Sequence, residues 1–174
     1  AGKPDIKCDI SNADWNNIGL SNYRSVIHLA AKTSVSESLE KPEKFIEVNS
    51  HATLNLFRAC VDQHVERVIF ASSAAVYGSS VEEIKKIGEE GTSESPYADT
   101  KLYGEEIARE LSTENTSFLC LRFFNVYGPL QKKDGPYSAV IPVFIHNRIM
   151  GKEIEIFGDG GQTRDFVHVN DVCK

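Results

Sequence analysis

Short apolar segments alternate with longer amphipathic ones along most of the chain. The segments 25–31 (SVIHLAA), 67–73 (RVIFASS) and 117–124 (SFLCLRFF) are rich in β-branched and aromatic residues, which is typical of buried strands. The segment 42–63 instead places apolar residues three or four positions apart, which predicts a helix that buries one face, and 96–113 predicts a second helix. Strands that alternate with helices in this way indicate βαβ units and a parallel sheet, so we expect an α/β fold.

The C-terminal part of the chain has a more broken pattern. Residues 138–150 suit a helix, and the alternating segments 153–157 (EIEIF) and 165–169 (DFVHV) predict two further strands. Residues 77–95 are rich in glycine, serine and charged side chains, so we expect mainly a loop there, with a short helical turn at 81–87.

Composition excludes several classes of protein. With 19 Lys and Arg against 25 Asp and Glu, the 174-residue chain has a net charge of −6. It lacks the clustered basic residues that neutralise phosphates in a nucleic-acid binder. No apolar run approaches the roughly 18 residues of a membrane span, and the N-terminus lacks the pattern of a signal peptide. We therefore expect neither a nucleic-acid partner nor a membrane partner.

The four cysteines stand far apart in the sequence, and they form neither a CxxC pair nor a group with a nearby pair of histidines. This spacing is typical of reduced thiols rather than of a disulfide framework or a zinc site. We expect a cytoplasmic protein that holds no metal.

Tyr97 and Lys101 form a YxxxK pair on the second predicted helix. A spacing of four places both side chains on one helix face, so the ammonium can lie near the phenol. A cation there would lower the pKa of the tyrosine from about 10 and allow the phenolate to act as a general base. Taken alone, the pair is also compatible with a surface tyrosine and lysine on an amphipathic helix.

Ser72 and Ser73 end the strand that precedes this helix. The carboxyl ends of strands are where open α/β sheets place their ligands. A hydroxyl there could share a hydrogen bond with a substrate hydroxyl and with the oxygen of Tyr97. The simpler interpretation of both serines is that they cap the end of the strand.

Seven short motifs follow one another along the chain: CDI (8–10), VIHLAA (26–31), KPEKFIEVN (41–49), SSAAVYG (72–78), SPYADTK (95–101), LRFFNVYGP (121–129) and GDGGQTRDFVHVNDV (158–172). In these motifs and their order the sequence resembles the NAD-dependent sugar-nucleotide epimerase/dehydratase family of the extended short-chain dehydrogenases. It is most similar to the UDP-glucose 4-epimerase-like members. The resemblance implies a Rossmann-like doubly wound parallel sheet, NAD as the cofactor and a UDP-sugar as the substrate.

The resemblance also implies roles for individual residues. Tyr97 matches the catalytic base, Ser73 the catalytic serine or threonine, and Lys101 the partner of the base, which also binds the nicotinamide ribose. The residues that match cofactor contacts are Asp9, Ile10, Leu29, Ala30, Ala31, Asn49, Ser72, Tyr97, Lys101, Phe123 and Val126. The residues that match contacts with the nucleotide sugar are Ser73, Tyr97, Asn125, Val140, Phe157 and Arg164, of which Arg164 would contact the diphosphate.

Several of these residues have a structural alternative. Asn49 could be a helix-interior asparagine that is satisfied locally, and Val140 and Phe157 could be core residues. Arg164 could be a solvated side chain in a glycine-rich turn. We interpret His28 and His168, which lie in strand patterns, as packed or capping histidines rather than ligands.

The two residues after Ser73 indicate which chemistry the family resemblance implies. Dehydratases of the family carry an acidic pair at these positions, where this chain has Ala74 and Ala75. Methyl groups transfer no protons, so epimerisation at C4 through a transient 4-keto intermediate is the expected reaction. The alternatives are a uronate epimerase, a decarboxylase, the disfavoured 4,6-dehydratase, or a binding module for NAD or a nucleotide sugar that has no catalytic activity.

The chain lacks one feature of the family, since neither GxxGxxG nor GxGxxG occurs in it. We therefore expect a central fragment in which the first βαβ unit is absent. Residues 1–128 would form a partial NAD-binding domain with the catalytic residues, and residues 129–174 the start of a nucleotide-sugar-binding region. Such a fragment alone is not expected to bind NAD tightly. Family members also suggest a homodimer through helices at 42–63 and 96–113.

Overall fold

The computed structural model describes residues 6–132 and 139–174. The chain divides into two compact units, Ala1–Arg122 and Phe123–Lys174.

A parallel sheet runs through the first unit. Its strands are β1 (Ser25–His28), β2 (Arg67–Ser73) and β3 (Ser117–Phe123), in the order β1-β2-β3. Strand β1 pairs with β2 in parallel, and Ser25 lies opposite Arg67. The three strands expected from the apolar runs are confirmed, as is the α/β class.

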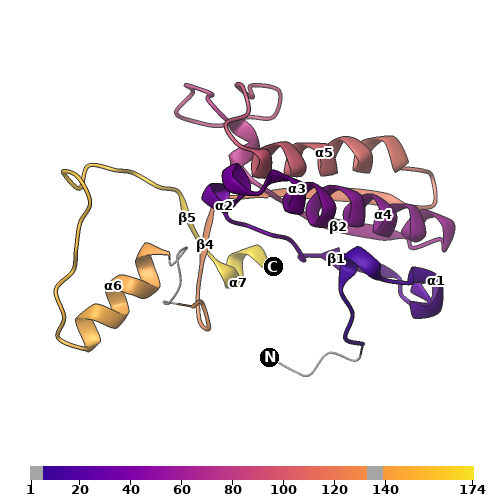
Figure 1. The fold of residues 1–174 in the computed structure, drawn as a ribbon, viewed down its shortest axis with the longest axis horizontal. Helices are drawn as coiled ribbons and strands as arrows, with labels where there is room; N and C mark the ends of the chain where they lie inside the picture. The colour runs from indigo at the N-terminus through magenta and orange to yellow at the C-terminus, as the bar shows by residue number, and fades with distance from the viewer. Residues whose placement is uncertain (1–5, 133–138) are drawn as a thin grey trace. The chain divides into compact units, whose positions relative to one another are not determined.

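Helices connect these strands and pack on the sheet (Figure 1). After β1 come α2 (Val35–Glu40), α3 (Pro42–Phe45), a π-helical turn η3 (Ile46–His51) and α4 (Ala52–Asp62). The last three form the single helix expected at 42–63, and Pro42 occupies its first turn, where a missing N–H has no cost. Helix α5 (Pro96–Leu111) lies beside α4 and packs on β2.

Further short helical segments lie before β1 and after β2. Before β1 they are η1 (Ile10–Asn12), α1 (Trp15–Ile18) and η2 (Leu20–Asn22), and the segment η4 (Ala74–Tyr77) directly follows β2.

Aromatic rings fill the space between the sheet and the helices. Phe57 of α4 is fully buried, and its ring centroid lies 5.5 Å from that of Phe70 and 4.9 Å from that of Phe118. Helix α5 comes close to this layer at Gly104, where a Cβ atom would stand 2.5 Å from two ring carbons of Phe70. The alternate strand positions behave differently, since Ile27 is 63% exposed and Leu119 is 48% exposed. The described residues of this unit therefore bury one face of the sheet.

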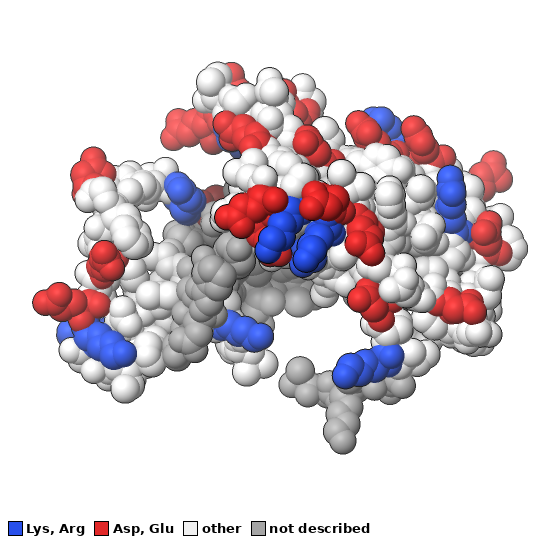
Figure 2. All heavy atoms as spheres, viewed as in Figure 1, with Lys and Arg blue, Asp and Glu red and all other residues white. Residues whose placement is uncertain are grey.

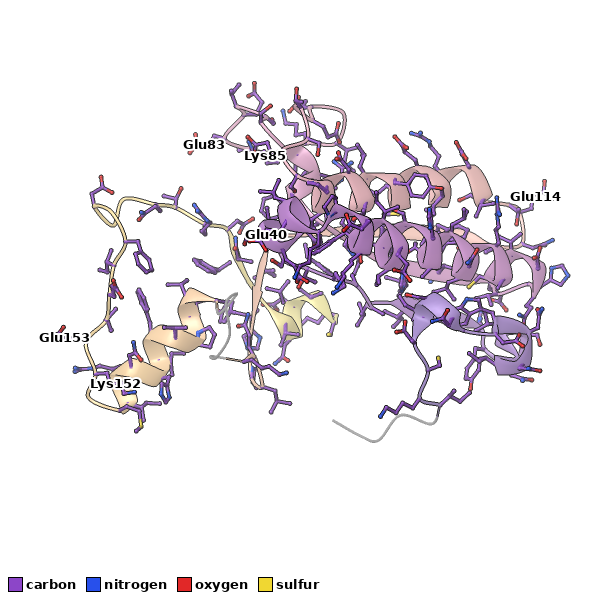
Figure 3. All side chains as sticks on the ribbon, in the orientation of Figure 1. Glu40, Glu83, Lys85, Glu114, Lys152 and Glu153 are labelled. Atoms are coloured by element: carbon purple, nitrogen blue, oxygen red, sulfur yellow. The ribbon has the colours of Figure 1, made fainter. Side chains whose placement is uncertain are left out.

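The loop between η4 and α5 is closed at its base. The N–H of Ser79 donates to the carbonyl of Thr92 at 3.0 Å, and the N–H of Gly91 donates to that of Tyr77, also at 3.0 Å. A Cβ atom at Gly78 would stand 2.1 Å from the Thr92 oxygen, so only glycine allows this approach. The tip of the loop, where Figure 3 labels Glu83 and Lys85, exposes the apolar residues Val81, Ile84 and Ile87. The helical turn predicted at 81–87 is wrong, because the backbone there is irregular and the apolar side chains that would support a helix are exposed.

The second unit contains a smaller parallel pair. Strand β4 (Asn125–Tyr127) lies beside β5 (Phe166–His168), with Asn125 opposite Phe166. Helix α6 (Val140–Ile149) and the short α7 (Val169–Val172) complete the unit.

The predictions for this part of the chain have mixed outcomes. The helix expected at 138–150 and the strand expected at 165–169 are confirmed as α6 and β5. The strand predicted at 153–157 is wrong, because this segment is irregular and pairs with no strand among the described residues. The apolar side chains of the alternating pattern remain exposed, since Ile154 is 41% exposed and Ile156 is 60% exposed.

Candidate active site

The end of β2 and the first turns of α5 bring the predicted catalytic residues together. The Ser95 hydroxyl caps α5 by accepting from the N–H of Ala98 at 3.1 Å, which places Tyr97 in the first turn. Ser73 ends β2, and its oxygen accepts from the N–H of Ala75 at 3.2 Å. The hydroxyl hydrogen of Ser73 is then free for the Tyr97 phenol, with which Ser73 forms a side-chain hydrogen bond.

Lys101 lies one helical turn after Tyr97 and is only 3% exposed. Its ammonium donates to the carbonyl of Ala71 at 2.8 Å. The same atom stands 4.9 Å from the ring centroid of Phe70 and 5.9 Å from that of Tyr97. Burial among these groups lowers the pKa of Lys101 to about 8.

The pKa of Tyr97 moves in the direction opposite to the one expected from the sequence. Burial raises it, because a phenolate loses solvation there, and the hydrogen bond from Ser73 only partly opposes this effect. The expectation that Lys101 lowers the pKa of Tyr97 is therefore wrong for this structure. The lysine is held by a main-chain carbonyl of β2, and its charge is itself disfavoured by burial.

The burial of Lys101 predicts how the free energy of unfolding depends on pH. Its pKa is lower in the folded chain than its ordinary 10.5, so its burial costs free energy in full below about pH 8 and not above about pH 10.5. The cost is about 3 kcal/mol at about 1.4 kcal/mol per pKa unit, and the bond to Ala71 returns about 1 kcal/mol. In the full-length protein we expect Lys101→Met to raise the free energy of unfolding by about 2 kcal/mol at pH 7.

Urea unfolding at pH 7 and above about pH 10.5 measures this difference. The advantage of Lys101→Met should disappear at the higher pH, whereas Lys152→Met, at an exposed position, should have no effect at either. A Lys101→Met protein that is less stable than the wild type at pH 7 would contradict the prediction.

Asn49 shapes the loop that follows β1. It is 2% exposed, its side-chain oxygen accepts from the N–H of Lys32 at 2.9 Å, and its amide donates to the Lys32 carbonyl at 2.9 Å. The amide also reaches the Thr100 hydroxyl in α5 at 3.2 Å. Asn49 is thus satisfied by contacts distant in sequence, and it ties the loop to the helix that carries Tyr97.

The loop held by Asn49 has a surface that suits a dinucleotide. It contains Leu29, Ala30 and Ala31 directly after β1, and Leu29 is 65% exposed. The two alanines add little bulk beside the main chain, and close approach of a dinucleotide to the backbone requires small residues at this end of a parallel sheet. The small side chains of Ala30 and Ala31 therefore fit the close approach of a dinucleotide such as NAD.

The other predicted cofactor residues of the first unit have different surroundings. The hydroxyl of Ser72 is buried and donates to Glu105 in α5 at 2.5 Å, so its side chain serves the packing of β2 on α5. The carboxylate of Asp9 is exposed and accepts from the N–H of Ser11 at 2.9 Å, which caps η1, and Ile10 is half-buried.

The remaining predicted residues lie in the second unit. Phe123 and Val126 are half-buried, and the side-chain amide of Asn125 donates to the Asp165 carbonyl at 3.0 Å. Val140 begins α6 and is 42% exposed.

Phe157 and Arg164 lie on the irregular segment between α6 and β5. Phe157 is 76% exposed, and the Arg164 guanidinium donates to the Thr163 carbonyl at 2.7 Å. Val140 and Phe157 are therefore not core residues of this unit.

The two histidines are packed and capping residues in the structure. His28 is 4% exposed, stacks on Phe70 and stands 2.9 Å from the Thr53 hydroxyl. Burial and the nearby Lys101 lower the pKa of His28 to about 4, so it is neutral at pH 7. His168 accepts from the N–H of Asn170 and caps α7.

An ionic cluster beside the site was missed in the sequence. Arg122 of β3 reaches Glu105 of α5 with its Nη2 at 2.7 Å, pairs with Glu90 of the loop, and lies over the Tyr77 ring at 4.7 Å. A signal was present, because strand alternation puts Arg122 on the same face as Phe118. Glu105 follows Lys101 by four residues on the same helix face.

Other features bear on the partner expectations. Among the described residues no three His, Cys, Asp or Glu side chains gather as metal ligands would, and all four cysteines are free. No helix within 6–132 or 139–174 has the length and apolar character needed to cross a membrane. On the face drawn in Figure 2, the acidic and basic side chains of the first unit are interspersed rather than gathered by sign.

Comparison with known proteins adds independent information. A family model described as the NAD dependent epimerase/dehydratase family matches residues 3–174. A curated relative from Bacillus cytotoxicus, a UDP-N-acetyl-alpha-D-glucosaminuronate decarboxylase, is 36% identical over 95% of this chain and 53% of its own length.

Two solved structures share the fold. The UDP-N-acetylglucosamine 4-epimerase from Methanobrevibacter ruminantium, in complex with UDP-N-acetylmuramic acid, has a TM-score of 0.90 and 39% identity, over 96% of this chain and 54% of that one. MoeE5, solved with UDP-glucose and NAD, has a TM-score of 0.83 and 37% identity, over 96% and 55%.

These comparisons cover only part of each relative. The chain spans about half the length of the curated relatives it matches. The named activities of the curated relatives and of the solved structures also differ, and include UDP-glucose 4-epimerase, UDP-glucuronate 4-epimerase and a hexosamine 5,6-dehydratase.

Proposed function

Because the chain belongs to the NAD-dependent epimerase/dehydratase family, we propose that the full-length protein uses NAD to epimerise a UDP-sugar at C4. The arrangement of Ser73, Tyr97 and Lys101 at the end of β2 supports this proposal most directly. It places a buried phenol, a hydroxyl bonded to it and a buried ammonium at the carboxyl end of a parallel strand, where such sheets bind their ligands.

The chain's own residues would move one proton in each direction. Tyr97 takes the proton of the C4 hydroxyl as the sugar is oxidised to a 4-ketone, and returns it after the ketone has turned over in the pocket. Ser73 stabilises the phenolate by donating to it. Lys101 adds positive charge on the same helix face, and its bond to the Ala71 carbonyl fixes the ammonium.

When bound, NAD would supply a hydride acceptor for C4 and, in its oxidised form, positive charge that favours the phenolate. Lys101, Tyr97 and the loop 29–31 would hold it in the first unit, and Phe123 and Val126 are proposed contacts from the second. We also propose cofactor contacts from Asp9, Ile10 and the main chain of Ser72.

The proposed substrate contacts beyond Ser73 and Tyr97 come from the second unit. The exposed Phe157 and Val140 offer apolar surface for the nucleotide base, Asn125 a polar contact to the sugar, and the exposed Arg164 a guanidinium for the diphosphate. The proposal includes a cytoplasmic location, which rests on the free cysteines, and a homodimer, which rests on the family resemblance.

Dehydration is disfavoured by the residues that follow Ser73. Ala74 and Ala75 open the segment η4 next to Ser73, and their methyl groups can neither donate nor accept the proton that elimination of water would require.

A decarboxylase is the second candidate, and a specific observation favours it. The Bacillus cytotoxicus relative is named as a decarboxylase of a UDP-linked uronate. Oxidation of a uronate at C4 produces a β-keto acid, which can lose CO2. The same Tyr97 chemistry would therefore serve either reaction.

The two candidates predict different products from a panel of UDP-sugars. With the full-length protein and NAD, we expect UDP-glucose and UDP-galactose to interconvert, with inversion at C4 and no release of CO2. Anion-exchange separation of the sugars and a CO2 assay on UDP-glucuronate measure both outcomes. Release of CO2 without C4 inversion of any sugar would favour the decarboxylase and contradict our proposal.

A further inference from the structure

Arg122 stands at the centre of a half-buried ionic cluster next to the proposed catalytic residues. Its side chain is 12% exposed, and those of Glu105 and Glu90 are 15% and 23% exposed. The Nε of Arg122 donates to both oxygens of Glu105, at 2.9 and 3.1 Å. One guanidinium thus connects β3, α5 and the loop that precedes α5, with the planar geometry that suits carboxylates.

Glu105 links this cluster to the end of β2. Three residues of α5 at intervals of four, Tyr97, Lys101 and Glu105, are bonded to three consecutive residues of the strand. Tyr97 is bonded to the Ser73 hydroxyl, Lys101 to the Ala71 carbonyl and Glu105 to the Ser72 hydroxyl. The last of these bonds, at 2.5 Å, holds the residue directly before Ser73.

Glu105 can serve this link only while Arg122 neutralises it. A half-buried carboxylate that has lost its cationic partner is strongly disfavoured, so it would turn toward solvent. This change removes the acceptor of the Ser72 hydroxyl and loosens the end of β2 against α5. Because Ser73 is the next residue, its hydrogen bond to Tyr97 would be disturbed as well.

We propose that Arg122 is a positioning residue for the Ser73–Tyr97 pair, acting through Glu105 and Ser72. The catalytic meaning of this role rests on the proposed function. Arg122 touches neither Ser73 nor Tyr97 in the contacts of the described chain; it fixes the strand and the helix that carry them.

The test compares Arg122→Met with the wild type in the full-length protein, with NAD and the interconverting UDP-hexoses. We expect kcat to fall by about 30-fold, because a small displacement of the base is costly. The KM of the sugar should change by less than about threefold, because Arg122 binds no substrate. Arg122→Lys should recover only part of the loss, because an ammonium cannot fork between two carboxylates.

The matched control is Arg24→Met, which removes the exposed Arg24–Glu66 ion pair of the same unit. It should leave kcat unchanged. A merely structural role for Arg122 would lower the melting temperature while leaving kcat per folded molecule unchanged, and that result would overturn the proposal.

A second readout does not depend on the substrate. In protein labelled with 13C at tyrosine Cζ, the Tyr97 resonance is the one absent from Tyr97→Phe. It should shift in Arg122→Met and stay in place in Arg24→Met. If no sugar is turned over and this resonance shifts, the proposed function fails and the positioning role stands. If sugars are turned over and neither kcat nor the resonance responds, the positioning role fails alone.

If Arg122→Met does not fold, two conservative variants keep the proposal testable. Ser72→Ala and Glu105→Gln each weaken the same link, and we expect each to lower kcat by about tenfold. The double variant should be little worse than either single one, because the link is already broken. Fully additive losses would overturn the proposal.

Discussion

Replacing Tyr97 with Phe is expected to lower kcat for C4 epimerisation by about 10³-fold in the full-length protein. The change removes one oxygen atom and keeps the ring, which packs edge-on against Phe45 at 6.4 Å between centroids. The loss should therefore fall on proton transfer rather than on folding or binding, and the KM of the sugar should change by less than about threefold.

Initial rates over a range of UDP-sugar concentrations measure this effect, with melting temperature as a check on folding. Tyr23→Phe is the matched control, because Tyr23 is 52% exposed and lies outside the site. Turnover by Tyr97→Phe at the wild-type rate would remove Tyr97 from the role of base. Failure of Tyr97→Phe to reduce bound NAD, while UDP-sugar still binds, would place the loss at the oxidation step.

Replacing Gly104 with Val should destabilise the full-length protein by about 3 kcal/mol, since overpacking of a tight core forces side chains and backbone to move. Gly104 faces the Phe70 ring at a distance that leaves no room for a Cβ atom, and Phe70 is 1% exposed. The ring is also held by contacts with Phe57 and His28, so it cannot simply turn away.

Urea unfolding of Gly104→Val beside Glu110→Val separates crowding from helix propensity. Glu110 is an exposed position of the same helix, where valine should cost less than about 0.7 kcal/mol. Adding Phe70→Leu to Gly104→Val should restore part of the lost stability, because it removes the ring atoms that clash. Equal losses for the two valine variants would show that the contact with Phe70 is not limiting.

The sequence predicted those elements whose signals are local. Strand β2 was expected at the residues where it occurs, because a β-branched and aromatic run is bounded by charges and serines. Helix α5 begins where Ser95 and Pro96 place a capping side chain and a first-turn proline. The sequence also predicted that Tyr97 and Lys101 lie close to Ser73. In a parallel sheet, the carboxyl end of a strand and the start of the helix that follows it lie at the same edge.

Features that depend on tertiary partners could not be predicted from local pattern. EIEIF alternates as a strand does, yet within 6–132 and 139–174 no strand pairs with it. The spacing of Tyr97 and Lys101 showed that they share a face. It did not show that the Ala71 carbonyl holds the ammonium or that burial raises the pKa of the phenol. Glu90, Glu105 and Arg122 are far apart in sequence and meet only in the folded chain.

The closed base of the loop before α5 determines where residues can be inserted into the chain near this site. Its two glycines and their hydrogen bonds return the chain to nearly the point where it left, so the geometry between Ser73 and Tyr97 is independent of the segment between 81 and 87. Additional residues could accumulate at that tip without moving either side chain. The segment is thus a natural place for the gain of a tag, a linker or a recognition element, while both reacting groups keep their positions.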